Sequence, residues 1–180
     1  SGGFGALQLA SLYPEKFSRV GSFGGDLYFE ITHKSMLADF LNDLRDGKIG
    51  SSLRECLEQG VTHYILGLCA AYSPNLDDSV WSMDFPIDPK TAMMNEDIWQ
   101  HWLSFDPLCW TSSRLQVLKK MDLIYLSAGL HDECQLHLGA QAFEHRCRQE
   151  GINVHYDTFD GKHSLLIQQM EAGLIALLRP

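Results

Sequence analysis

The stretch SGGFGALQLASLYPEKFSRVGSFGG, residues 1–25, carries the first evidence for the fold. Phe4, Leu7 and Leu9 recur among glycine and alanine at helical spacing, and Pro14 closes the pattern, which predicts a helix over 2–12. The apolar run over 17–25 predicts a short buried strand that ends in glycines. A helix followed directly by a buried strand is typical of an α/β domain.

The same alternation returns near the end of the chain. LIYLSAG at 123–129 predicts a buried strand, and NVHYDTF at 153–159 alternates as a strand does. Ser164 is placed to cap a last helix over 165–178. Between the two strands a helix is predicted by apolar residues at helical spacing, namely Leu136, Ala140, Phe143 and Cys147. Three strands are few for this class, so we expect the later part of a larger α/β sheet.

The segment 26–110 lacks this alternation. Helical patterns over 36–45 and 53–71 are interrupted by YSPNLDD and DFPIDPKT, whose prolines break secondary structure. We therefore expect one domain over 1–180, with 26–110 as a largely helical, cap-like insertion. Four tryptophans are expected to pack in the core or in this cap, where one could also line an acyl pocket: Trp81, Trp99, Trp102 and Trp110.

Composition excludes several classes of partner. Fourteen Lys and Arg against 23 Asp and Glu give a net charge of -9, and the basic residues form no patch, so nucleic acid is not expected as a partner. No apolar stretch approaches the ~20 residues of a membrane span, so no membrane association is expected. The five cysteines are odd in number and include no C-x-x-C pair, which argues against a disulfide framework or a zinc site and favours a cytoplasmic location.

Polar residues follow two of the predicted strands. Asp132 lies three residues past Gly129, and His163 lies four residues past Phe159. An open parallel sheet binds its ligand just beyond the carboxyl ends of its strands. Ser1, Asp132 and His163 are also the residue types of one chemistry, because a serine hydroxyl needs a histidine to take its proton and a carboxylate to orient that histidine.

Five segments, in order, resemble one family. SGGFGAL is similar to the back half of a G-x-S-x-G-G nucleophile elbow, AAYSPN and WLSFDPL to a middle region, and HDECQLHLGAQAF and FDGKHS to acid and histidine segments. Together they resemble the putative-esterase family of α/β-hydrolases, which includes S-formylglutathione hydrolase, enterochelin esterase and feruloyl esterases. The resemblance runs from Ser1 to about His163, and the chain is expected to be the family's sheet from the elbow onward, truncated before it.

The resemblance implies a carboxylic ester hydrolase that forms an acyl-enzyme on short acyl or aryl esters and needs no cofactor. It makes Ser1 the nucleophile, Asp132 the acid and His163 the base of a catalytic triad. The backbone N–H of Gly2, the residue after the nucleophile, would be one oxyanion donor. Family members carry the second donor in a loop ahead of the elbow, and this chain shows no such segment before Ser1.

Other interpretations of these residues stay open. Glu133 and Asp160 compete with Asp132 for the role of acid, and Asp132 could instead cap the helix that follows it. His131 and His137 bracket two carboxylates, but they lack the i, i+4 spacing of a helical metal site, so no metal is expected. The glycines of GSFGG lack the spacing of a phosphate loop.

Two further functions compete with the triad. The α-amine of Ser1 could serve as its own base, as in N-terminal-nucleophile hydrolases, although these place the residue before a strand and here a helix follows. The alternative outside catalysis is an incomplete hydrolase-like domain that acts by binding or self-association. A sheet that lacks its earlier strands would expose an edge, and a homodimer could form through it.

Overall fold

The computed structural model describes residues 1–50 and 60–179, which form two compact units. Unit 1 comprises Ser1–Thr32 and Asp106–Pro180, and unit 2 comprises His33–Phe105. Unit 2 lies within the segment 26–110, for which an insertion is predicted. Its role as a cap stays a prediction.

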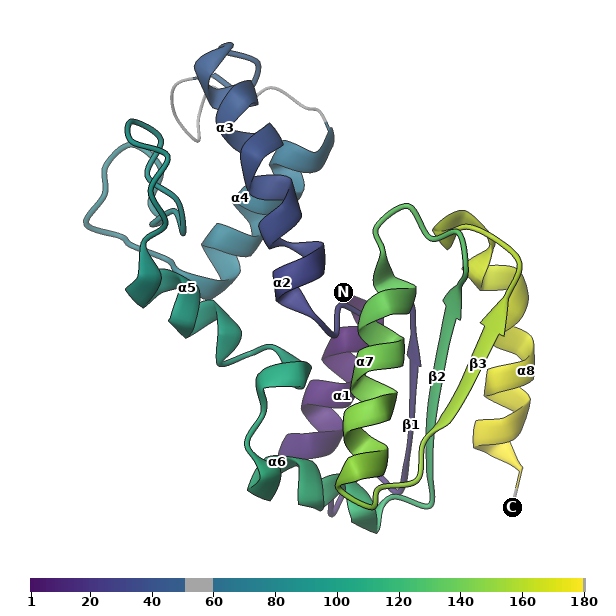
Figure 1. The fold of residues 1–180 in the computed structure, drawn as a ribbon. Coiled ribbons are helices and arrows are strands. Elements are labelled where there is room, and N and C mark those ends of the chain that lie inside the picture. Colours follow the sequence, from purple (N-terminus) through teal and green to yellow (C-terminus); the bar gives the residue numbers. More distant parts are fainter. Residues whose placement is uncertain (51–59, 180) are drawn as a thin grey trace. The chain divides into compact units, whose positions relative to one another are not determined.

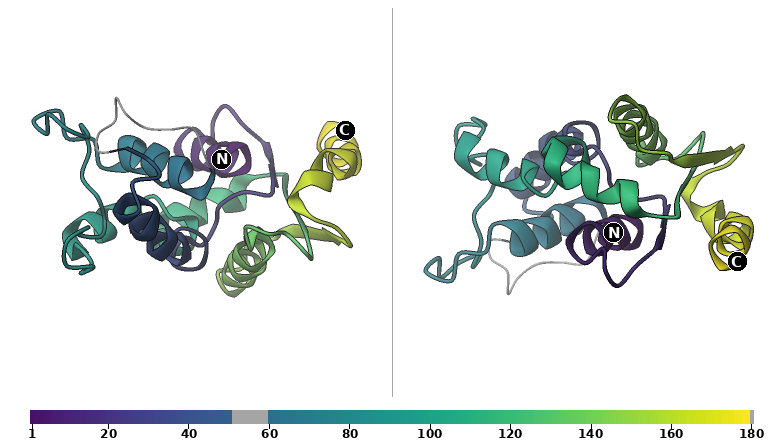
Figure 2. Two further views of the ribbon diagram at one scale, coloured as in Figure 1. Left: turned by 90° about the horizontal axis from the view of Figure 1, so that it is seen from above. Right: turned by 90° about the horizontal axis from the view of Figure 1, so that it is seen from below.

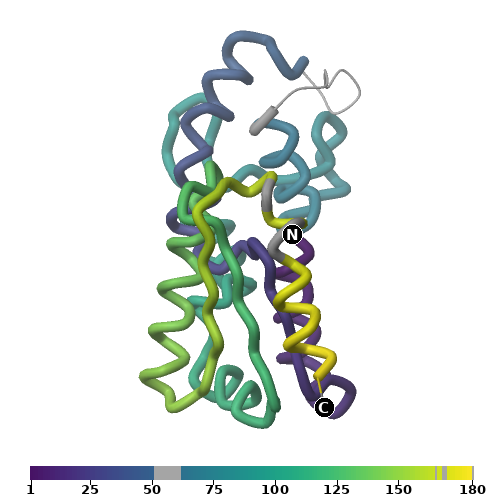
Figure 3. Tube along the Cα trace, turned by 90° about the vertical axis from the view of Figure 1, so that its right-hand side faces the viewer, coloured from purple at the N-terminus to yellow at the C-terminus, as the bar shows by residue number. Residues whose placement is uncertain are grey.

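Unit 1 is built on a three-stranded parallel sheet in the order β1-β2-β3. The strands are β1 (Arg19–Phe23), β2 (Leu123–Gly129) and β3 (His155–Phe159). They run the same way, so their carboxyl ends and the N-terminus of the chain lie at one end of the sheet (Figures 1 and 3). Residues 123–129 form the strand predicted. β1 is two residues shorter at each end than the strand predicted over 17–25, and β3 begins two residues later than the strand predicted over 153–159.

Helices cover both faces of this sheet (Figure 2). α1 (Gly2–Leu12) and α7 (Leu136–Gln149) lie on one face, and α8 (Leu166–Leu178) lies on the other. The α/β class is therefore confirmed. A single 3₁₀ turn, η5 (His163–Leu165), leads into α8. The prediction for Ser164 is wrong in detail, because the helical turn already begins at His163 and Ser164 lies inside it.

The core of unit 1 lies between the sheet and the pair α1 and α7. Ile124, Leu126 and Ala128 alternate along β2 toward this side. They pack with Leu7 of α1 and with three buried apolar residues of α7, Ala140, Phe143 and Cys147. Tyr125 takes the opposite face, where its ring lies 5.7 Å from that of Phe23 and α8 packs over both. β2 is therefore buried on both faces, as a central parallel strand must be.

A buried carboxylate joins the two parts of unit 1 where the chain leaves and re-enters it. Asp106 is fully buried, and its Oδ2 accepts a hydrogen bond from Phe29 N–H at 2.8 Å while its Oδ1 accepts one from Leu108 N–H at 2.9 Å. Burial raises the pKa of Asp106 to about 6. Short helical segments flank these contacts: α2 (Phe29–Thr32), η3 (Pro107–Cys109), α6 (Ser112–Val117) and η4 (Leu118–Lys120).

Unit 2 is helical and rich in aromatic contacts. Its helices are η1 (Lys34–Met36), α3 (Leu37–Arg45), α4 (Gly60–Tyr72) and α5 (Glu96–Leu103). The helix predicted over 36–45 is confirmed, whereas positions 53–59 of the helix predicted over 53–71 lie outside the described residues. Trp99 and Trp102 are buried here, and Trp102 Nε1–H donates to Ser73 Oγ at 3.1 Å. Trp110 is buried in unit 1 against Phe143.

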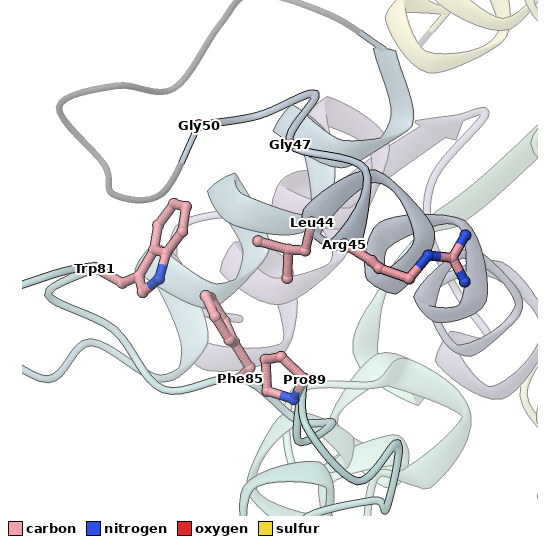
Figure 4. Close-up of a pocket in the computed structure, with 7 residues that line it drawn as sticks. All are labelled: Leu44, Arg45, Gly47, Gly50, Trp81, Phe85 and Pro89. Atoms are coloured by element: carbon pink, nitrogen blue, oxygen red, sulfur yellow. The ribbon is translucent and has the colours of Figure 1, made fainter.

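Unit 2 also contains a hollow of about 550 Å³ (Figure 4). Trp81, Phe85, Pro89 and Leu44 line it, and the Arg45 guanidinium points away from Trp81.

None of the described helices is long and apolar enough to span a membrane. The four cysteines that the structure describes are free thiols, and Cys56 lies outside that part of the chain.

The first turn of α1 touches the end of β1 through glycines. A Cβ added at Gly3 would lie 2.8 Å from Ser22 Oγ and 3.0 Å from the Cα and N of Gly25. A Cβ added at Gly25 would lie 2.8 Å from Phe4 N. Backbone therefore packs directly on backbone at this crossing, and no side chain fits between.

We predict that Gly3→Ala and Gly5→Ala have opposite effects on stability. Gly3→Ala forces the backbone of α1 away from Gly25, and we expect a loss of about 1–3 kcal/mol in the free energy of unfolding. A Cβ at Gly5 meets nothing within 4 Å, so the same change there should add about 0.5–1 kcal/mol through helix propensity. Urea denaturation of both variants measures this, and equal effects would contradict the close approach.

Candidate active site

The loops that follow β2 and β3 are joined by backbone hydrogen bonds. Leu130 N–H donates to Phe159 O at 2.9 Å, and His131 N–H donates to Gly161 O at 3.0 Å. Gly129 must be glycine here, because a Cβ would collide with the carbonyl oxygen of Gly161. These contacts arise because two neighbouring parallel strands end at the same edge, and they bring residues 30 positions apart in the chain together.

The two predicted residues of these loops form a hydrogen-bonded pair. His163 Nδ1 lies 3.0 Å from Asp132 Oδ2. Asp132 is only 2 % exposed, and its other oxygen, Oδ1, accepts a hydrogen bond from Cys134 N–H at 2.9 Å. The His163 side chain is 42 % exposed. The carboxylate is thus held through both of its oxygens, while the His163 side chain as a whole stays partly exposed to solvent.

The neighbouring carboxylates have other partners. Glu133 Oε2 accepts a hydrogen bond from the backbone N–H of His163 at 3.2 Å, and Asp160 Oδ1 lies 3.1 Å from His131 Nε2. Of the three carboxylates that compete for the role of acid, Asp132 alone contacts the ring. Nor does Asp132 cap α7, whose N-cap is Gln135 in a left-handed conformation without a side-chain hydrogen bond.

Gly24 lies directly against the His163 ring. It follows β1 with a φ of +54°, and a Cβ there would lie 2.9 Å from His163 Cε1 and 3.1 Å from Nδ1. Gly24 is not among the site residues predicted from the sequence. The signal was present in GSFGG, since paired glycines at a strand end indicate close approach of another group.

Ser1 lies at the start of α1, directly before the helix. Its side chain is 99 % exposed, and its backbone nitrogen lies 3.7 Å from Asp26 Oδ2. Among the residues described, no hydrogen bond joins Ser1 Oγ to the His163 ring. The first turn of α1 and the His163 ring both reach the Gly24–Gly25 dipeptide, since Gly3 lies against Gly25 and His163 lies against Gly24.

Gly2 follows Ser1 in the chain, and the Cys134 thiol interacts electrostatically with the Ser1 nitrogen. The N–H of Gly2 belongs to the first turn of α1, whose N–H groups have no acceptor within the helix. Burial raises the pKa of the Cys134 thiol, the carboxylates of Asp132 and Glu133 raise it further, and the positive charge at the Ser1 nitrogen lowers it. Cys134 therefore lies within electrostatic reach of both the acid loop and Ser1.

A metal-ligating cluster is absent from the part of the chain that the structure describes. His131 faces Asp160, as noted above. Tyr156 OH donates to the backbone carbonyl of His137 at 3.1 Å, and the His137 Nδ1 is buried without a hydrogen bond. The two histidines that bracket the carboxylates in the sequence therefore serve different contacts.

Comparison with known proteins assigns the chain to a family. The family model described as putative esterase matches residues 1–167. The chain belongs to the putative-esterase family. A thioesterase domain from the curacin biosynthetic pathway is a similar solved structure, with 14% sequence identity and a TM-score of 0.36 over 98% of this chain and 62% of that one. This chain thus spans less than two thirds of that domain. A comparison with curated proteins finds no match.

We predict that Gly24→Ala displaces the His163 ring and lowers ester hydrolysis by at least about tenfold, because the added Cβ occupies the ring's contact surface. Gly151→Ala is the matched control, since Gly151 has a φ of +70° and its added Cβ would meet only Lys119 at 3.6 Å. Both glycines have a positive φ, so either substitution places an alanine in the left-handed region. Initial rates on p-nitrophenyl acetate measure the effect, and equal loss in both variants would show that backbone strain alone is responsible.

Proposed function

We propose that the chain hydrolyses carboxylic esters with Ser1 as nucleophile, His163 as base and Asp132 as the acid that orients the histidine. The observation that supports this most is the 3.0 Å contact between His163 Nδ1 and the buried Asp132 Oδ2, with the His163 side chain 42 % exposed. Membership of an esterase family supports the same chemistry.

The proposed reaction has two steps of the same form. His163 Nε2 takes the Ser1 Oγ proton as Oγ attacks the ester carbonyl, and Nδ1–H donates to Asp132, which stabilises the imidazolium. The tetrahedral oxyanion accepts a hydrogen bond from Gly2 N–H. Its collapse breaks the C–O bond, and the leaving alkoxide takes the proton from Nε2. Water then attacks the acyl-enzyme in the same way, which releases the acid and restores Ser1.

Small acyl or aryl esters are the proposed substrate class. The Ser1 side chain is almost fully exposed and the His163 side chain is half exposed, so the two reacting groups are open to solvent. An open site offers few contacts to a large substrate. Activated esters with good leaving groups need the fewest such contacts.

The test is hydrolysis of p-nitrophenyl acetate by Ser1→Ala, His163→Ala and Asp132→Asn variants. We expect each to lower kcat by about 10³-fold or more while the fold is retained. Asp160→Asn is the matched control, since Asp160 is a carboxylate of the neighbouring loop that contacts His131. Undiminished turnover in Ser1→Ala and His163→Ala would rule the triad out.

Self-association is a second proposed property. β1 lies at the edge of the described sheet, and apolar side chains are exposed on the helices that flank it, with Leu12 of α1 at 57 % and Leu178 of α8 at 81 %. An unpaired strand edge readily pairs with another chain. We expect a dimer in solution, measured by light scattering after size-exclusion chromatography. A monomer at micromolar concentration would contradict it.

A further inference from the structure

Two consecutive carboxylates contact the same histidine at different groups. Asp132 Oδ2 lies 3.0 Å from the ring Nδ1 of His163, and Glu133 Oε2 accepts a hydrogen bond from the His163 backbone N–H at 3.2 Å. The first contact orients the ring about its own bonds. The second holds the backbone from which the ring projects, so the two contacts act on different parts of the same residue.

The backbone contact satisfies a donor that has no acceptor of its own. His163 is the first residue of η5, and N–H groups in the first turn of a helix lack a partner inside it. Lys162, at the N-cap position, makes no side-chain hydrogen bond to the turn. An N-cap side chain reaches only the second or third N–H of a helix, so it would leave the first one, that of His163, without an acceptor. Glu133 supplies this acceptor from the neighbouring loop.

Glu133 is ionised at neutral pH in this position. Hydrogen bonds from its own backbone N–H and from that of His163 lower its pKa, and attraction to the His163 and Lys162 charges lowers it further. A negative charge at a helix start is also favoured by the helix dipole. Because the Glu133 side chain is exposed, solvent and salt screen its charge at the ring, and the hydrogen bond is the stronger of its two effects.

We propose that Glu133 is a positioning residue that fixes the His163 backbone so that the imidazole stays aligned with Asp132 and with the nucleophile. This inference rests on the proposed function. It assigns the two carboxylates of the HDE sequence separate tasks, with Asp132 on the ring and Glu133 on the main chain.

The experiment compares Glu133→Ala, which removes the acceptor, with Glu133→Gln, which keeps an acceptor oxygen at the same reach and removes the charge. Glu171→Ala is the matched control, because Glu171 is an exposed glutamate on α8 with no contact to the site. Two readouts are taken from each protein. One is kcat and KM on p-nitrophenyl acetate, and the other is the Cε1–H NMR resonance of His163, assigned by its loss in His163→Ala.

We expect Glu133→Ala to lower kcat by about tenfold with KM nearly unchanged, since misplacement of the base affects the transition state and not ester binding. Glu133→Gln should stay within about threefold of the parent protein. The His163 resonance should shift and broaden in Glu133→Ala and match the parent in Glu133→Gln and Glu171→Ala.

Three results would overturn the proposal. The first is a kcat for Glu133→Ala equal to that of Glu171→Ala. The second is equal loss in Glu133→Gln and Glu133→Ala, which would assign the effect to charge. The third concerns a protein that hydrolyses no ester at all: the proposed function then fails, and the resonance alone decides, with an unchanged His163 signal in Glu133→Ala ruling out the positioning role.

Discussion

The parallel pairing of β2 with both of its neighbours is the constraint on which the candidate site depends. Parallel strands send all their carboxyl ends to one edge, so the residues that follow β1, β2 and β3 meet, although Gly24 and His163 are more than 100 positions apart in the chain. β2 is held in the centre because its two faces are buried under different helices. A slip of one residue in its register would exchange those faces and move Asp132 out of reach of His163.

Glycine allows the groups at this edge to approach one another closely. Gly3 and Gly25 let α1 rest on the end of β1, Gly24 lets the His163 ring lie on the backbone, and Gly129 lets the two loops join. At each of these positions a methyl group would collide with backbone or with the ring. The site is therefore assembled largely from main chain, and only a few side chains carry its chemistry.

The acidic residues near His163 differ in burial and in the groups that they contact. Asp132 is buried and hydrogen-bonded through both oxygens. Its position is therefore fixed, and its shielding from solvent strengthens its pairing with an imidazolium. Glu133 and Asp160 are exposed, where a charge pair contributes little to stability. Asp132 and Glu133 are adjacent in the loop after β2, so their side chains point in different directions and reach different groups of His163.

The alternation of helices and strands in unit 1 could be predicted from the chain alone, because the spacing of apolar residues follows directly from which side of each element is buried. The sequence also determined the membership of the esterase family and singled out Ser1, Asp132 and His163, because the order and spacing of their segments survive in the chain. It left three carboxylates in competition and did not identify Gly24 or the backbone role of Glu133.

The choice of the carboxylate that contacts the His163 ring follows from the folded chain, since it depends on the register of β2 against β3 and on the turn after Gly129. Hydrogen bonds between loops that are distant in sequence leave no local pattern, so they can be found only once the strands are paired.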